Sequence, residues 1–153
     1  MRVSKFLSAT RKLEAAYEQM CRPICRDFGL SRTGFDILMF LSNNPELFTA
    51  KDISLYRNIR PNVISAHVDR LVSEGYLLRQ PVDGDRRKLK LVCTRKADPV
   101  ARAGRSMQKE FISFLTRGFT REELEAFHRD VTRLEENAEA LARQVQKKEG
   151  AEC

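Results

Sequence analysis

The chain has 153 residues, of which 42% are hydrophobic and 32% are charged, and its formal net charge is +7. This length fits one domain, or a small module with an extension, and the composition excludes collagen-like and disordered chains. The first 13 residues mix apolar side chains with Arg2, Lys5, Arg11 and Lys12, so no signal peptide is predicted. No segment has the roughly 20 apolar residues that cross a bilayer, and a cytoplasmic location is expected.

The positive charge is concentrated in the middle of the chain. Residues 51–96 carry 11 basic and 5 acidic side chains, whereas residues 97–153 carry 10 and 11. Many basic faces are simply solvated, but a local excess of this size is also the electrostatic footprint of phosphate binding. Charge alone does not separate these two interpretations.

Two helices are predicted in the first 45 residues. Residues 4–21 have an amphipathic pattern that begins at Ser4 as a cap, and Pro23 is expected to kink or end this helix. Ser31 is predicted to cap a second helix that stops near Pro45. Its inward face is expected to comprise Phe35, Leu38, Met39 and Leu41.

Two shorter helices are predicted to follow. Thr49 with Asp52 three residues later is typical of a helix start, and Pro61 is well suited to the first position of the next helix. In that next helix Ile64, Val68 and Leu71 recur at spacings of four and three and are expected to face inward.

A β-hairpin is predicted after Gly75. Residues 76–80 and 88–92 have the composition of strands, and Asp83-Gly84 between them favours a tight turn.

The last third is predicted to be helical. One helix begins at Asp98-Pro99, and Thr120 with Glu123 forms a capping box for the last one. The last helix carries apolar residues at alternating gaps of three and four: Leu124, Phe127, Val131, Leu134, Ala138, Leu141 and Val145. Such a seam needs a partner helix, which is the first helix, the preceding helix, or the same helix of a second subunit. We favour the second subunit.

The order of two short helices and a basic hairpin predicts a winged helix-turn-helix. In such a motif the second helix enters the major groove, and its outward residues here are Asn62, Ser65, Ala66 and Asp69. The predicted fold class is mainly α with a small β-hairpin wing. Residues 1–30 and 97–153 are expected to be dimerisation helices that flank a DNA-binding region at residues 31–96.

The sequence resembles the MarR family of bacterial regulators. The resemblance lies in the recognition helix from Asn62 to Leu71, in Gly75-Tyr76-Leu77-Leu78-Arg79, and in Asp83-Gly84-Asp85-Arg86-Arg87. It implies a homodimer that binds a pseudo-palindromic operator on double-stranded DNA and acts as a repressor relieved by a small effector. No cofactor and no metal are expected. Where the family usually has Leu-Thr and a later glycine, this chain has Cys93 to Ala97.

The predicted DNA contacts have three roles. Asn62 and Ser65 are assigned to base edges, where Ala66 replaces the longer polar side chain of many members. Phosphate contacts are assigned to Arg57, Arg60, Arg70 and Lys88, and the minor-groove contact of the wing to Arg86 and Arg87. Arg79 and Asp85 are expected to position the wing, with Asp85 pairing with Arg87 or Arg79. For His67, both a packing or capping role and a phosphate contact stay open.

An effector site is expected between the winged region and the helical dimer region, with walls that include Cys25, Phe28, Phe35 and Met39. Cys21 and Cys25 share a helical face, where structural packing is favoured over redox sensing. Together with Cys93 and Cys153 they form no CxxC pair and no zinc pattern.

Three rival functions follow from the same residues. An enzyme is disfavoured because the sequence has no phosphate-binding glycine loop, no HExxH motif and only two histidines. The other two are an architectural or protein-binding winged helix without a specific operator, and a regulator that senses oxidants through a thiol.

Overall fold

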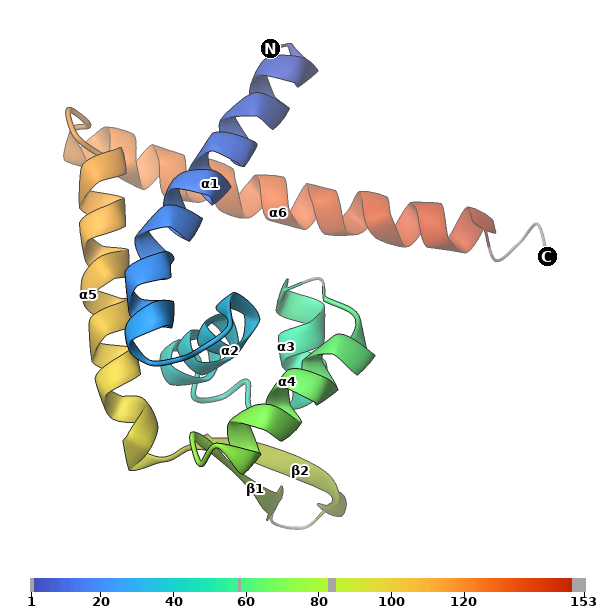
Figure 1. Ribbon diagram of the computed structural model, residues 1–153. Coiled ribbons are helices and arrows are strands. Elements are labelled where there is room, and N and C mark those ends of the chain that lie inside the picture. The colour runs from blue at the N-terminus through green and yellow to red at the C-terminus, as the bar shows by residue number, and fades with distance from the viewer. Residues whose placement is uncertain (1, 58, 83–84, 150–153) are drawn as a thin grey trace. The chain divides into compact units, whose positions relative to one another are not determined.

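The computed structural model describes residues 2–57, 59–82 and 85–149, without the side chains of residues 56, 57, 85–88 and 146–149. Its contacts divide the chain into two units, residues 1–111 and 112–153. The described part is mainly helical with one two-stranded antiparallel sheet, which confirms the predicted fold class (Figure 1). None of its helices combines the length and apolarity needed to cross a membrane.

The first unit contains most of the elements. In chain order they are α1 (Val3–Asp27), α2 (Arg32–Asn43), α3 (Ala50–Arg57), α4 (Pro61–Ser73), β1 (Leu77–Val82), β2 (Asp85–Cys93), a short 3₁₀ helix (Arg95–Ala97) and α5 (Asp98–Leu115). The end of α5 belongs to the second unit, together with α6 (Arg121–Glu149).

Capping side chains fix several helix starts. The Ser31 hydroxyl accepts the Gly34 N–H (3.0 Å), and Thr49 and Asp52 cap α3 reciprocally, with Thr49 N–H to Asp52 Oδ2 at 2.9 Å. Thr120 and Glu123 do the same for α6. These three predicted caps are therefore confirmed.

The start and end of α1 differ from the prediction. The helix begins after Arg2, whose side chain makes no capping hydrogen bond. The predicted Ser4 cap is therefore wrong. Pro23 does not end the helix, which continues to Asp27. A proline removes one backbone hydrogen bond, and the remaining bonds of a 25-residue helix carry it past this position.

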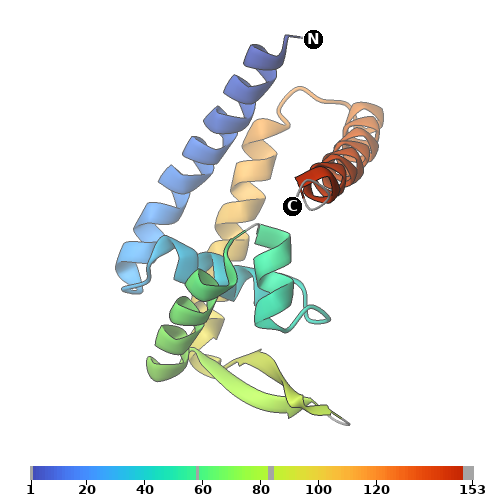
Figure 2. The same ribbon diagram turned by 90° about the vertical axis from the view of Figure 1, so that its right-hand side faces the viewer.

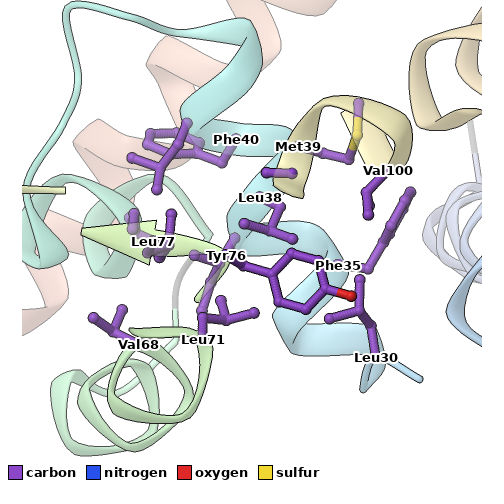
Figure 3. Packing of buried hydrophobic residues seen from close by; sticks show 14 of the residues in the cluster. Leu30, Phe35, Leu38, Met39, Phe40, Val68, Leu71, Tyr76, Leu77 and Val100 are labelled. Atoms are coloured by element: carbon purple, nitrogen blue, oxygen red, sulfur yellow. The ribbon is translucent and has the colours of Figure 1, made fainter. Parts of the chain in front are cut away.

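The core of the first unit joins α2, α4, the hairpin and the start of α5 (Figure 3). Ile64, Val68 and Leu71 face inward with 0–2% of their surface exposed, as their spacing predicted. Among the side chains that the structure describes, the largest fully buried one is Phe35 on α2. Each fully buried residue of this kind contributes about 1.5–3 kcal/mol by removal of apolar surface from water.

Helix α5 approaches α2 closely at Gly104. A Cβ atom at this position would lie 2.2 Å from Met39 Sδ and 3.2 Å from Phe35 Cε2. Gly104 is therefore the residue that lets the two helices pack directly, and Phe35 and Met39 fill the space beside it.

The hairpin is longer than predicted. The strands pair from Leu77 with Cys93 to Val82 with Asp85, with an irregularity after Pro81. Proline is tolerated in an edge strand, which is why the pairing continues through a residue that sequence reasoning placed in the loop. The hairpin projects from the body of the first unit (Figure 2).

In the second unit the predicted seam of α6 is exposed. The exposed fractions are 55% for Phe127, 50% for Leu134 and 61% for Leu141. Leu124 is half-buried, and Phe127 packs on Phe119 with ring centres 6.3 Å apart.

Candidate nucleic-acid interface

Helices α3 and α4 are joined by a short connection that is fixed at its described residues. The Ser54 hydroxyl donates to the Ile59 carbonyl (2.6 Å), and the Ile59 N–H donates to the Ser54 carbonyl (3.1 Å). Because Ile53 on α3 and Ile64 on α4 are both fully buried, the two helices are anchored to one core. The outward face of α4 is thus held rigidly at the surface.

That outward face carries the side chains that sequence reasoning selected. Asn62, Ser65, Ala66 and Asp69 are all exposed, and Asn62 directly follows Pro61 at the first position of the helix. Val63 is also exposed, by 39%, although it is apolar. The start of α4 therefore offers an amide, a hydroxyl and two aliphatic groups to a partner.

An ion pair links α4 to the hairpin. Arg79 Nη2 on β1 donates to Asp69 Oδ1 at 2.5 Å. The sequence had nominated Arg79 to position the wing but had not identified Asp69 as a partner. Asp85, the partner considered for Arg79, has its side chain outside the described part of the chain.

The base of the hairpin has further fixed contacts. Thr94 donates its hydroxyl to the Gly75 carbonyl (2.7 Å), and Lys96 donates to the Glu74 carbonyl (2.7 Å) while lying 4.6 Å from the centre of the Tyr76 ring. The Leu91 N–H also donates to the Phe48 carbonyl (2.8 Å). These bonds fix the residues on either side of the hairpin and one position of β2.

The predicted phosphate-contacting residues are only partly described. Arg60 is exposed immediately before α4, and Arg70 is exposed on the third turn, where Arg70 Nε donates to Glu74 Oε1 (2.7 Å). The side chains of Arg57, Arg86, Arg87 and Lys88 lie outside the described residues. The backbone places residues 86–88 on β2.

His67 is half-buried on the side of α4 that faces α2. Its Nδ1 is hydrogen-bonded to the Ser31 hydroxyl, 3.3 Å away, and Ser31 is the cap of α2. Of the two roles left open, this contact supports packing and capping. Ser31 therefore couples the start of α2 to the recognition helix.

The region predicted as an effector site is largely filled by side chains. Phe35 and Met39 are 0% and 3% exposed, and Cys25 and Phe28 are half-buried against the same core. A hollow of about 240 Å³ lies next to Met39, between α1, α2 and α5. It is lined by Tyr17, Asp36, Met39, Phe40, Asn43, Asn44 and Gln108.

Polar side chains in this hollow form a chain of hydrogen bonds. The Asn43 amide donates to Gln108 Oε1 (3.1 Å), and Gln108 Nε2 donates to the Tyr17 hydroxyl (2.7 Å). Arg32 pairs with Asp36 (3.0 Å) and lies 5.0 Å from the centre of the Tyr17 ring. These contacts connect residues that are far apart in sequence, and no local sequence pattern predicted them.

Burial keeps the described cysteines protonated at neutral pH. It raises the pKa of the Cys21 thiol and of the Cys93 thiol to about 11, and it raises the pKa of Cys25 as well. Cys21 is fully buried. A reactive cysteine needs the opposite, a lowered pKa and access to solvent.

No group of three potential metal ligands occurs among the residues that the structure describes. The described outward face of α4 offers hydrogen-bonding and apolar groups, and Asp69 on this face is paired with Arg79.

The comparison with protein families gives one match. The profile of the MarR family matches residues 28–88, which span α2, α3, α4 and most of the hairpin. No curated protein sequence matches the chain.

Solved structures with this fold are numerous. A MarR transcriptional regulator from Methanosarcina mazei has a TM-score of 0.75 at 18% identity, over 92% of this chain and 94% of that one. The transcriptional regulator Tm0710 from Thermotoga maritima has 0.55 at 26%, over 90% and 96%. A MarR-family regulator from Listeria monocytogenes, complexed with a 26mer DNA, has 0.74 at 14%, over 90% and 88%. The likeness extends beyond the matched segment to nearly the whole chain.

Proposed function

We propose that the chain is a sequence-specific DNA-binding regulator of transcription, because its residues 28–88 match the MarR family profile and its fold is that of solved MarR regulators. The observation that carries the proposal is the outward face of α4, exposed and anchored between α3 and the wing. The regulator from Listeria monocytogenes, which shares the fold, was crystallised with DNA. The basic excess of residues 51–96 supports the same partner.

DNA binding divides among three sets of residues. Asn62 and Ser65 contact base edges in the major groove, with Ala66 beside them. The phosphate contacts belong to Arg57, Arg60, Arg70 and Lys88, and the minor groove is contacted by Arg86 and Arg87 on the wing. The ion pair of Arg79 with Asp69 holds the wing relative to α4.

The active species is a homodimer. The exposed apolar face of α6 needs a cover, and a second copy of the chain supplies one. Two recognition helices related by a two-fold axis meet successive major grooves about 34–36 Å apart, so the operator is a pseudo-palindrome.

The DNA-binding proposal is tested by fluorescence anisotropy on a selected operator and on random DNA. Arg60→Ala, at a phosphate, is expected to weaken both DNAs alike and to lower the salt slope by about one unit per contact. Asn62→Ala, at a base, is expected to cost about 1–3 kcal/mol on the operator and little on random DNA. Equal affinity of the unaltered protein for operator and random DNA would instead identify an architectural winged helix.

Regulation is assigned to a small effector in the first unit. The hollow beside Met39 has unfilled volume; of the four expected walls Met39 lines it, whereas Cys25, Phe28 and Phe35 are packed in or against the core. A ligand there acts by binding one arrangement of α1, α2 and α5 better than another, and the expected effect on DNA is release of a repressor.

The effector proposal is tested with a simple phenol, 4-hydroxybenzoate, as the probe. It is expected to raise the melting temperature and to weaken operator binding, and Asn43→Ala, at the exposed rim of the hollow, is expected to reduce both effects. No response in either measurement at millimolar probe would exclude this class of effector.

A further inference from the structure

The outward face of α4 has an unusual composition for a helix that reads DNA. From Pro61 to Asp69 it contains no lysine and no arginine. Guanine presents two acceptors, N7 and O6, in the major groove, and its commonest specific partner is a bidentate arginine or lysine. The part of the helix that is closest to the bases thus lacks the usual reader of guanine.

The two ionisable side chains on this stretch are already engaged, and the Ser65 hydroxyl suits either kind of base pair. His67 is half-buried and bonded to Ser31, and Asp69 is paired with Arg79. Asp69 would otherwise be the natural acceptor for the amino group of cytosine. The nearest described cations, Arg60 and Arg70, lie before the helix and in its third turn.

The exposed groups at the start of α4 match an A·T pair. Asn62 carries the amide that bonds adenine at N6 and N7. Val63 and Ala66 carry methyl groups, which suit the C5-methyl group of thymine. Single exposed apolar residues are common on protein surfaces, so the 39% exposure of Val63 gains meaning from its place beside Asn62 rather than by itself.

From this face we infer that α4 reads A·T pairs, with Asn62 on adenine and with Val63 and Ala66 on the methyl groups of thymine. The inference rests on the proposed DNA-binding function and adds the class of bases that each half-site contains. Val63, which sequence reasoning did not nominate, becomes a specificity-determining residue.

The test begins with selection of binding sites from random double-stranded DNA by the full chain. In the selected operator each thymine of a half-site is then replaced by uracil, which removes the C5-methyl group and keeps the base pair. Loss of one buried methyl contact is expected to weaken binding about three- to fourfold. Replacement of the adenine facing Asn62 by 7-deazaadenine is expected to cost about fivefold or more.

Matched variants separate the methyl contact from other effects. Val63→Ala, which removes both γ-methyl groups, is expected to abolish the effect of uracil at one position, whereas Val63→Thr, which keeps one γ-methyl group, is expected to retain it. Uracil outside the half-sites is the DNA control. Because the C5-methyl group lies in the major groove, contacts of the wing with the minor groove do not respond to this change.

The outcomes distinguish this inference from the proposed function. An operator with conserved G·C pairs beneath α4, insensitive to uracil, overturns the A·T assignment and leaves sequence-specific binding intact. If binding remains sensitive to uracil in Val63→Ala and in every other variant of α4, the roles of Val63 and Ala66 are overturned. Selection that yields no operator at all overturns the proposed function itself.

Discussion

Helices α4 and α6 both carry an apolar stripe, but the structure covers only one of them. The inward residues of α4, such as Ile64 and Val68, are at most 1% exposed because α2 and the hairpin cover them. The stripe of α6 is 37–61% exposed from Phe127 to Val145. The winged region therefore completes its core within one chain, while α6 has the surface of a helix that needs a partner.

This contrast separates residues that stabilise the fold of one chain from residues that are expected to join two chains. Substitutions in the winged core act on the folding of one chain, and their cost does not depend on protein concentration. In the proposed dimer, substitutions in the seam of α6 are expected to act through association, with a cost that grows with concentration. The predictions below use this difference, from the largest expected effect to the smallest.

The most disruptive change is the double substitution Leu134→Glu with Leu141→Glu in the seam. Two carboxylates in an apolar interface are expected to abolish the dimer, and loss of the second linked half-site to weaken operator binding about 10²- to 10⁴-fold. Light scattering measures the mass and anisotropy the affinity. Glu135→Gln with Glu139→Gln, on exposed positions of the same helix, serves as the control. A variant that remains dimeric with full affinity would show that the seam packs within one chain.

Phenylalanines in the two regions give the next contrast. Phe35→Ala is expected to lower the free energy of unfolding by about 3–5 kcal/mol at every protein concentration, since it leaves a cavity in a closed core. Phe127→Ala is expected to cost about 1 kcal/mol or less in dilute, monomeric protein and more as the dimer forms. Urea unfolding at several concentrations measures both. Identical concentration dependence for the two variants would contradict the comparison.

The sequence predicts the helix starts and the inward face of α4 well because the signals for them are local. The caps at Ser31, Thr49 and Thr120 depend on neighbours three residues away, and the inward face of α4 follows from spacing alone. Contacts between distant segments were not predictable in this way. The pairing of Asp69 with Arg79 and the close approach of α5 at Gly104 depend on tertiary packing, which composition and period do not encode.

The seam shows the same limit from the other side. The spacing from Leu124 to Val145 predicted an apolar stripe correctly but left three possible partners. Within the second unit that stripe is exposed, so its cover comes from outside that unit. An apolar repeat shows that a helix must pack. The identity of its partner depends on the surface that complements the repeat.

Thiol reactivity measures how tightly the core of the first unit is closed. Burial raises the pKa of Cys21 from the ordinary 9.0 to about 11, so about 100-fold less thiolate exists at neutral pH. Alkylation of Cys21 by iodoacetamide, followed by peptide mass spectrometry, is expected to be slower in the native chain than in urea by at least this factor. Fast native alkylation of Cys21 would revive the oxidant-sensing alternative.

The same thiols predict a loss of stability in alkali. A thiol whose pKa is higher in the folded chain favours folding below its unfolded pKa, and this contribution disappears as the pH rises through the folded value. For Cys21 and Cys93 the window is pH 9 to about 11. Urea unfolding across this range is expected to show a decrease that is smaller in Cys93→Ala, after correction for its lower stability at pH 8.

The smallest expected effect comes from the helix caps, one in each region. Ser31→Ala removes the acceptor for the Gly34 N–H and the partner of His67, and Thr120→Ala removes the acceptor for the Glu123 N–H. Each loss is expected to cost about 1 kcal/mol.

In Ser31→Ala the cost should appear in global unfolding, and operator affinity should fall slightly because α4 loses one of its anchors. In Thr120→Ala it should appear as faster amide exchange in the first turn of α6 and as a weaker dimer. Ser31→Thr and Thr120→Ser, which keep the capping oxygen, are expected to recover most of each loss. Equal effects of both alanine variants on global unfolding would mean that α6 folds as part of the same cooperative core, and the distinction between a closed and an open region would not hold.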